Sequence, residues 1–225
     1  MTKAVLFDWV GTLAHPEPDR PVVLARSARE VGVSLPLDKL LRGIHAAEDV
    51  IPKGVPARWR EGAPENPFIR WWQVLSAEIS VTIPPEKMLE ITKRASKAAR
   101  SARWVLYDDV LPTLERFKTR GLVLGLITNL VLEGAGTGLD SYLNFVVTSK
   151  EVGADKPEPA IFLAALGRAG TKPGETVYVG DQYRLDVLGA RRVGINAVLI
   201  DRNDISPQVI DCPRIRSLAE LERLL

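Results

Sequence analysis

Several polar residues of this sequence have the types and spacing that phosphoryl transfer requires. Asp8 directly follows a short apolar run, and Asp181 follows another, with Asp186 five residues further on. Lys156 lies in a turn that contains glycine and proline. A carboxylate nucleophile beside a phosphate needs positive charge to cancel their repulsion, and a divalent ion held by Asp8 and Asp181 together with Lys156 can supply it. We therefore expect Asp8 to attack phosphorus and form an aspartyl phosphate, which water then hydrolyses.

Three further polar residues have predicted supporting roles in this chemistry. Thr128, through its hydroxyl, and Asn129, through its backbone or side-chain amide, can donate hydrogen bonds to phosphate oxygens. Asp186 is expected to orient Lys156 or a metal-bound water. Each of these residues is also a common turn or capping residue. Their combination with the two aspartates and the lysine favours the functional interpretation.

The apolar runs that precede these residues indicate buried strands of a parallel sheet. Such strands read as continuous hydrophobic runs because both faces of the sheet are covered. The five predicted strands are residues 4–7, 122–127, 144–147, 176–179 and 197–200. Helical patterns separate them at residues 112–120, 159–169, 186–193 and 217–225, the last with Ser217 and Glu220 spaced as a capping box. This alternation predicts an α/β fold with a doubly wound, Rossmann-like core, whose ligands bind beyond the carboxyl ends of the strands.

One long stretch interrupts the alternation with helices alone. Residues 19–31, 37–48, 68–79 and 84–102 have helical periodicity, and residues 51–67 read as a loop. We predict a core domain of residues 1–14 and 105–225, with residues 15–104 inserted as a helical cap domain. The cap tryptophans are expected to pack its interior and its contact with the core rather than to stack on a substrate; they are Trp59, Trp71, Trp72 and Trp104.

The overall composition is that of a globular protein. The chain has 225 residues, 46% of them hydrophobic, and a net charge of only +2, which gives no basis for binding nucleic acid or an anionic membrane. Cys212 is the single cysteine, so no intrachain disulfide forms. The sequence shows no long apolar span and no signal-peptide pattern after Met1, so we expect a cytoplasmic protein. A monomer and a homodimer are both open for its oligomeric state.

The motifs together resemble the haloacid dehalogenase superfamily of hydrolases. The residues that carry the resemblance are the run Phe7 to Leu13, Thr128-Asn129, the segment from Val147 through Lys156-Pro157, and Val179-Gly180-Asp181 through Asp186 to Gly189-Ala190-Arg191. The four motifs occur in order over nearly the whole chain, and the inserted helices resemble one of the superfamily's cap types. The resemblance implies a Mg²⁺ ion bound by Asp8, Asp181 and the backbone carbonyl of Val10, and a small phosphorylated metabolite as substrate.

Val10 is where the sequence departs from the superfamily pattern. Phosphatases of this superfamily usually have Asp at this position, which protonates the leaving alcohol and later activates water. Valine can do neither. The protein is therefore predicted to be a phosphatase for good leaving groups, such as acyl or aryl phosphates, or one that takes an acid from the substrate or the cap.

Three other interpretations of Val10 stay open. A 2-haloacid dehalogenase acting on a halogenated metabolite needs no acid, because halide leaves without a proton, but such members use no metal, and Arg42 is only a loose match to their arginine motif. A non-catalytic member would bind a phosphate-bearing ligand or a protein. A phosphonate hydrolase would need a cap lysine, and Lys53 lacks matching surroundings. His15, just after the first motif, is expected to be a solvated linker residue rather than part of the site.

Overall fold

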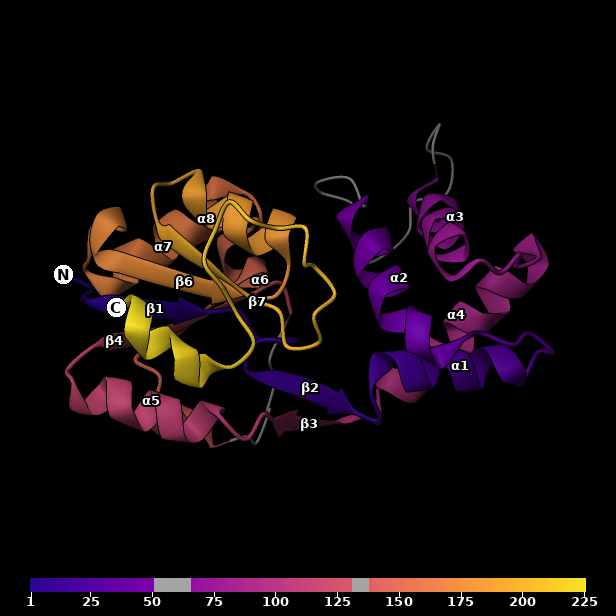
Figure 1. Cartoon of the computed structure of the whole chain (residues 1–225), viewed down its shortest axis with the longest axis horizontal. Helices are drawn as coiled ribbons and strands as arrows, with labels where there is room; N and C mark the ends of the chain where they lie inside the picture. The colour runs from indigo at the N-terminus through magenta and orange to yellow at the C-terminus, as the bar shows by residue number, and fades with distance from the viewer. Residues whose placement is uncertain (51–65, 131–137) are drawn as a thin grey trace. The chain divides into compact units, whose positions relative to one another are not determined.

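The structure is a computed structural model that describes residues 1–50, 66–130 and 138–225. The chain forms two compact units, one made of Met1–His15 with Trp104–Leu225 and the other of Pro16–Arg103 (Figure 1). We call the first the core and the second the cap. The predicted loop from residue 51 falls almost entirely outside the described residues, as do Lys53 and Trp59.

The core is built on a parallel six-stranded sheet with the order β5-β4-β1-β6-β7-β8. Its strands are β1 (Ala4–Phe7), β4 (Val123–Thr128), β5 (Phe145–Thr148), β6 (Thr176–Gly180), β7 (Asn196–Ile200) and β8 (Arg214–Ile215). All four residues of β1 are buried, because this strand lies between β4 and β6 in the middle of the sheet. The register pairs Phe7 with Leu126 on one side and Val179 on the other. Asp8, which directly follows β1, therefore lies next to the last residues of β4 and β6.

Helices cover both faces of this sheet (Figure 1). Alternate residues of β1 belong to two different hydrophobic clusters, since successive side chains of a strand point to opposite faces. Val5 and Phe7 pack on the face covered by α5 (Val110–Thr119) and the C-terminal 3₁₀ helix Leu218–Leu224. Leu6 packs on the other face, with residues of α7 (Pro159–Ala169) and α8 (Leu188–Arg191). The predicted Rossmann-like α/β core is confirmed.

The described residues of the cap form four helices with their own hydrophobic cluster. They are α1 (Arg20–Arg29), α2 (Leu37–Asp49), α3 (Pro67–Ile79) and α4 (Pro85–Ala99). Helix α1 packs on α4, and α2 packs on α3. Trp72 is buried in this cluster, and its indole N–H donates to the Thr92 hydroxyl at 3.2 Å. Trp71 lies half-buried with its ring edge-on to Trp72, at 5.2 Å between centroids. In the core, Trp104 packs against Trp9 with a tilt of 57° between the rings and 5.6 Å between their centroids.

Three short strands were not predicted from the sequence. β2 (Ala14–Glu17) and β3 (Arg103–Leu106) pair with each other in a separate two-stranded sheet, and β8 adds two residues to the edge of the main sheet. β2 reads Ala-His-Pro-Glu and has no apolar run, and the apolar run of β3 is only three residues long and partly exposed. Whether such segments form strands depends on the neighbouring strand with which they pair rather than on their own sequence pattern.

Two helices also differ from the prediction. The segment predicted as a helix over 186–193 is a π-helical turn, Tyr183–Val187, followed by the short helix α8. Turns of this kind often occur at functional sites, and Asp186 lies in this one. The C-terminal segment is a 3₁₀ helix, although its capping box of Ser217 and Glu220 is present as predicted. Across the described residues, no helix is long and apolar enough to cross a membrane.

Candidate active site

Three carboxylates meet at the carboxyl ends of β1 and β6. Asp8, Asp181 and Asp186 each offer one oxygen, and these oxygens lie within 4.8 Å of one another. Two glycines make room for this approach. A Cβ on Gly11, whose φ is +79°, would lie 2.2 Å from Oδ2 of Asp181, and a Cβ on Gly180 would lie 2.3 Å from Cγ of Asp186. The sequence therefore needs glycine at both positions to bring the acids together.

Lys156 binds two of these acids. Its Nζ donates to Oδ1 of Asp8 and, at 2.7 Å, to Oδ1 of Asp186. It also donates to the hydroxyl of Tyr178 at 3.1 Å. Burial disfavours the charged amine, but the nearby Asp186 and Asp8 outweigh it and raise the pKa of Lys156 above its usual range. The lysine is therefore a fixed cation at the edge of the sheet.

Asp8 is buried, with 7% of its surface exposed. Burial is the main cause that raises its pKa from 3.8 to about 6; Lys156 opposes this shift, and the negative charge of Asp186 adds to it. A buried carboxylate with few donors of its own is a good ligand for a cation and a good nucleophile, because little solvation has to be removed before it reacts.

Asp186 accepts hydrogen bonds through both of its carboxylate oxygens. Its Oδ1 accepts from Lys156 and, at 2.8 Å, from Tyr178, and its Oδ2 accepts from the backbone N–H of Gln182 at 3.0 Å. Both oxygens are thus engaged within the protein. This geometry suits the predicted role of orienting Lys156 better than a role as a metal ligand. Asp8 and Asp181 are then the acids of the cluster that suit a divalent cation, whose preferred ligands are oxygens.

Tyr178 belongs to this cluster, and sequence reasoning missed it. The hydroxyl bridges Lys156 and Asp186 from the middle of β6, and the residue is fully buried. Burial, followed by the charges of Asp186 and Asp8, raises its pKa well above 10.0, so the hydroxyl stays protonated. A tyrosine in an otherwise aliphatic buried run was the available signal, because a buried hydroxyl needs a partner.

Thr128 and Asn129 lie at the end of β4, as predicted, but their side chains make different hydrogen bonds. Asn129 holds the loop that carries Lys156: its Oδ1 accepts from the Lys156 N–H at 2.8 Å, and its Nδ2 donates to the Lys156 carbonyl at 3.3 Å. The sequence predicted that either the backbone amide or the side-chain amide of Asn129 contacts phosphate. The side-chain amide is instead hydrogen-bonded to the backbone of Lys156. Thr128 is buried and its Oγ1 accepts from the N–H of Leu130 at 3.0 Å. A threonine hydroxyl that accepts one hydrogen bond still has an O–H to donate.

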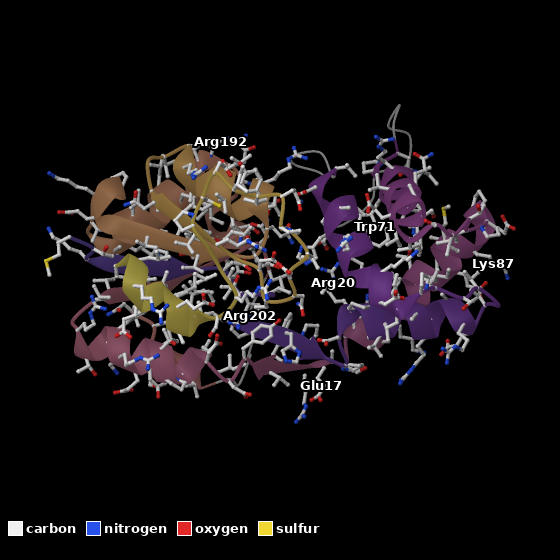
Figure 2. All side chains as sticks on the ribbon, viewed as in Figure 1. Glu17, Arg20, Trp71, Lys87, Arg192 and Arg202 are labelled. Carbon is white, nitrogen blue, oxygen red and sulfur yellow. The ribbon has the colours of Figure 1, made fainter. Side chains whose placement is uncertain are left out.

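The turn after Asp8 is fixed from the far end of the chain. Arg202, labelled in Figure 2, follows β7 and donates to the carbonyl of Thr12 at 2.7 Å. The same guanidinium makes two bonds to Asp109, at 2.9 and 3.0 Å, and stacks over the ring of Tyr107 at 3.9 Å. Asp109 also accepts from the hydroxyl of Ser217. Nothing in the sequence around Arg202 indicates these contacts.

Other candidates from the sequence lie elsewhere. The ring of His15 lies 5.0 Å from that of Tyr107, and His15 is not a member of the cluster of three acids. Arg42 is exposed on α2 of the cap. Val10 is half-buried and packs against the cluster that contains Val5 and Phe7, and its backbone bridges to Ala14. Its predicted role as a carbonyl ligand stays a prediction.

Comparisons with known proteins agree with this arrangement. A family model described as haloacid dehalogenase-like hydrolase matches residues 2–194. A glyceraldehyde 3-phosphate phosphatase from Methanopyrus kandleri is 32% identical over 216 residues, which cover 92% of this chain and 89% of that protein. A phosphoserine phosphatase from Thermus thermophilus is 37% identical over 123 residues, but the match covers only 52% of this chain and 49% of that protein. A solved phosphatase of the same superfamily from Thermococcus onnurineus superposes with a TM-score of 0.55 at 29% identity, covering 99% of this chain and 97% of that one.

Proposed function

Because this chain belongs to the haloacid dehalogenase-like hydrolase family, we propose that it is a metal-dependent phosphatase that acts through Asp8. The observation that carries this proposal is the cluster of three carboxylates with a buried lysine at the edge of the sheet. A phosphate group would be repelled by these acids alone. The acids and the lysine together make a site for a phosphate and a divalent cation.

The metal in this proposal is Mg²⁺. Asp8, Asp181 and the carbonyl of Val10 would hold it, and the ion would supply positive charge beside both the nucleophile and the phosphate. The donor set fits, since all three groups offer oxygen atoms and Mg²⁺ prefers oxygen. Asp186 stays outside this set because its oxygens already accept from Lys156, Tyr178 and backbone.

The protein residues would then act in two steps. A carboxylate oxygen of Asp8 forms a bond to phosphorus while the bond to the leaving oxygen breaks, and the leaving group takes the electron pair. Water next attacks phosphorus, releases inorganic phosphate and restores Asp8. The hydroxyl of Thr128 donates to the phosphate oxygens, Lys156 supplies positive charge beside them, and Asn129 fixes the lysine loop and offers its backbone amide. Asp8 has to be ionised to attack. Because its pKa is about 6, the ionised form predominates above pH 6.

Val10 limits the substrates in this proposal. Its side chain packs against the apolar cluster of the core and has no proton to give. A general acid is worth roughly 10²–10⁴-fold in rate, so alkyl phosphates without their own acid would react slowly. Acyl and aryl phosphates leave as stabilised anions and suit the site best. The similarity to a glyceraldehyde 3-phosphate phosphatase and a phosphoserine phosphatase supports a small phosphorylated metabolite as the substrate class.

The test is a substrate panel measured with wild-type protein and with Asp8→Asn. The panel contains an acyl phosphate, an aryl phosphate, an alkyl phosphate and a 2-haloacid, each with Mg²⁺ and with chelator. We expect release of inorganic phosphate, fastest from the acyl and aryl phosphates. This release should stop when chelator is added and when Asp8→Asn replaces the wild type. Phosphate release that the variant retains would refute Asp8 as the nucleophile.

A 2-haloacid dehalogenase is the second candidate, and Val10 is the observation that favours it. Halide needs no proton on departure, so an apolar residue at this position costs that reaction nothing. Asp181 argues against it, because dehalogenation through an aspartate needs no second acid for a metal. The same panel separates the two: halide release that chelator leaves unchanged would replace the phosphatase proposal.

A further inference from the structure

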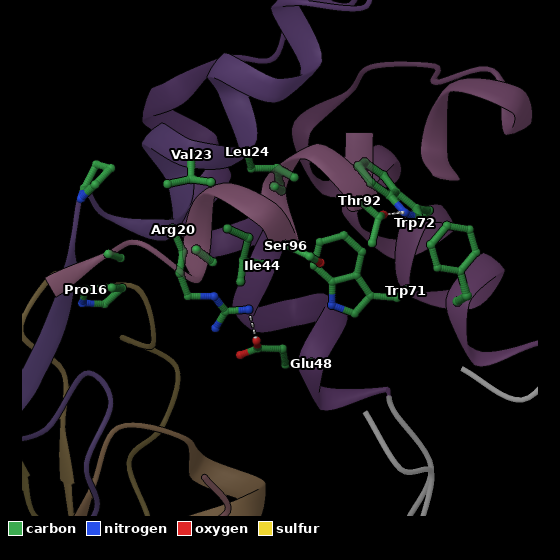
Figure 3. A pocket seen from close by; sticks show the side chains of 15 residues that line it. Pro16, Arg20, Val23, Leu24, Ile44, Glu48, Trp71, Trp72, Thr92 and Ser96 are labelled. Atoms are coloured by element: carbon green, nitrogen blue, oxygen red, sulfur yellow. Dashed lines mark hydrogen bonds and ion pairs between the residues drawn. The ribbon is translucent and has the colours of Figure 1, made fainter. Parts of the chain in front are cut away.

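The cap contains a pocket that the proposed chemistry does not use. Its volume is about 290 Å³, and all of its lining residues belong to the cap unit (Figure 3). Side chains from all four cap helices form its walls. This volume is near the lower end of the roughly 300–1,000 Å³ of small-molecule sites. It is also about twice the roughly 150 Å³ cavity that holds a benzene molecule. The pocket therefore has room for one ring with a short polar end.

The sequence of α4 explains why the space exists. Thr92, Ala95, Ser96 and Ala99 line the pocket from this helix, at spacings that place them on one face. Other residues that line the pocket have large side chains, among them Ile44, Phe68 and Trp71. Small side chains facing large ones leave a gap, whereas protein interiors are normally filled to crystal density. Trp71 is half-buried and offers its indole to this gap, as Figure 3 shows.

One side of the pocket carries a pair of opposite charges. Arg20 of α1 and Glu48 of α2 form an ion pair at 2.5 Å, drawn as a dashed line in Figure 3. The Arg20 side chain is 47% exposed, and that of Glu48 is 14% exposed. A guanidinium has five N–H donors and a carboxylate has several lone pairs, so each can take a ligand group while they stay paired. The pair presents a cation and an anion side by side next to an apolar wall.

We propose that this pocket binds a free apolar α-amino acid. The ligand carboxylate would pair with Arg20, its ammonium with Glu48, and its side chain would lie against Trp71 in the apolar part. A zwitterion fits better than an anion or a cation alone, because either of those would meet a like charge at Glu48 or Arg20. A ring of one aromatic amino acid matches the volume and can stack on the indole. Such a ligand would be an effector, because every residue that lines the pocket belongs to the cap unit and none to the Asp8 cluster.

The test uses the full chain and L-phenylalanine as the probe, followed by calorimetry and by tryptophan fluorescence. Three related compounds each lack one feature: phenylacetate has no ammonium, phenethylamine has no carboxylate, and L-alanine has no ring. We expect saturable binding of L-phenylalanine in the millimolar range or tighter, and at least about ten-fold weaker binding of the other three. Phenylacetate or phenethylamine binding as tightly as L-phenylalanine would overturn the assignment of a zwitterion.

Matched variants locate the binding. Ala95→Leu fills the pocket, and Ala98→Leu adds the same atoms to α4 at a position that does not line it. We expect Ala95→Leu to weaken binding at least about ten-fold and Ala98→Leu to leave it unchanged. Arg20→Gln removes the cation and serves as the second variant if Ala95→Leu lowers the melting temperature. Asp8→Asn should bind L-phenylalanine like wild type. Binding that Asp8→Asn loses, or that both pocket variants keep, would overturn the proposal, as would the absence of binding to wild type.

Discussion

The hydroxyl of Tyr178 offers a precise perturbation of the cluster formed by Lys156 and the carboxylates. Tyr178→Phe removes one oxygen and keeps the ring, which packs edge-on against Phe162 at 5.2 Å between centroids. The lost oxygen donates to Asp186 at 2.8 Å and accepts from Lys156 at 3.1 Å. All three polar side chains are buried, so water cannot replace the missing group without entering the core.

The size of the effect follows from these contacts. A hydrogen bond to a charged group is worth about 1.5–3 kcal/mol. Asp186 keeps Lys156 and the N–H of Gln182, and Lys156 keeps Asp8 and Asp186, so neither charge is left unpaired. We therefore expect the variant to lose about 2–3 kcal/mol of unfolding free energy, the value of one such bond rather than two. Because two carboxylates still hold the lysine, kcat should fall by less than about ten-fold, which is 1.4 kcal/mol.

The assay is urea unfolding at pH 7.5, together with kcat on the best substrate of the panel. Tyr142→Phe is the matched control, since Tyr142 is a half-buried tyrosine at the edge of the same core. The control should change the unfolding free energy by less than about 0.5 kcal/mol. Equal stability of Tyr178→Phe and wild type would refute the reasoning, because the hydroxyl would then contribute nothing to the buried charges.

Three further predictions concern the metal, the missing acid and the turn after Asp8. Asp8 must lose its proton to bind a cation, so calorimetry should show Mg²⁺ affinity falling about ten-fold per pH unit below its pKa of about 6 and levelling off above it. A flat profile would show that Asp8 is not a ligand. Val10→Asp should speed alkyl phosphate hydrolysis towards the roughly 10²–10⁴-fold that a general acid supplies, with little change for formation of the intermediate from aryl phosphates. No gain on alkyl esters in steady-state assays would mean that a missing acid is not the limit. Arg202→Met leaves Asp109 with hydroxyl and backbone donors but no cation, so thermal unfolding should show a loss of about 1.5–3 kcal/mol; Arg192→Met, an exposed arginine, should show almost none.

The pH profile also constrains turnover. Burial raises the pKa of Asp8, so the attacking form is lost as pH falls through about 6. Lys156 keeps its proton far above this, because the carboxylates of Asp186 and Asp8 hold it. The acid limb of kcat/KM is therefore assigned to Asp8, with metal binding expected to move it to lower pH.

Local sequence determined the framework of this protein. The apolar runs before Asp8, Thr128 and Asp181 predicted buried parallel strands, because hydrophobic pattern directly encodes burial. Parallel topology then places the carboxyl ends of neighbouring strands at one edge, which is why residues more than a hundred positions apart could be assigned to one site. The four motifs sufficed for the family.

The tertiary structure alone decided how the polar groups are shared. Asn129 had two predicted ways to bind phosphate, and the fold engages its side chain on the loop of Lys156, 27 residues away. The Arg202 guanidinium reaches Thr12 across 190 residues of sequence. A buried hydroxyl or guanidinium requires some partner, but the sequence around it does not say which one. That choice depends on which backbone and side-chain groups the folded chain brings within about 3 Å, and this is a property of the packing rather than of any local pattern.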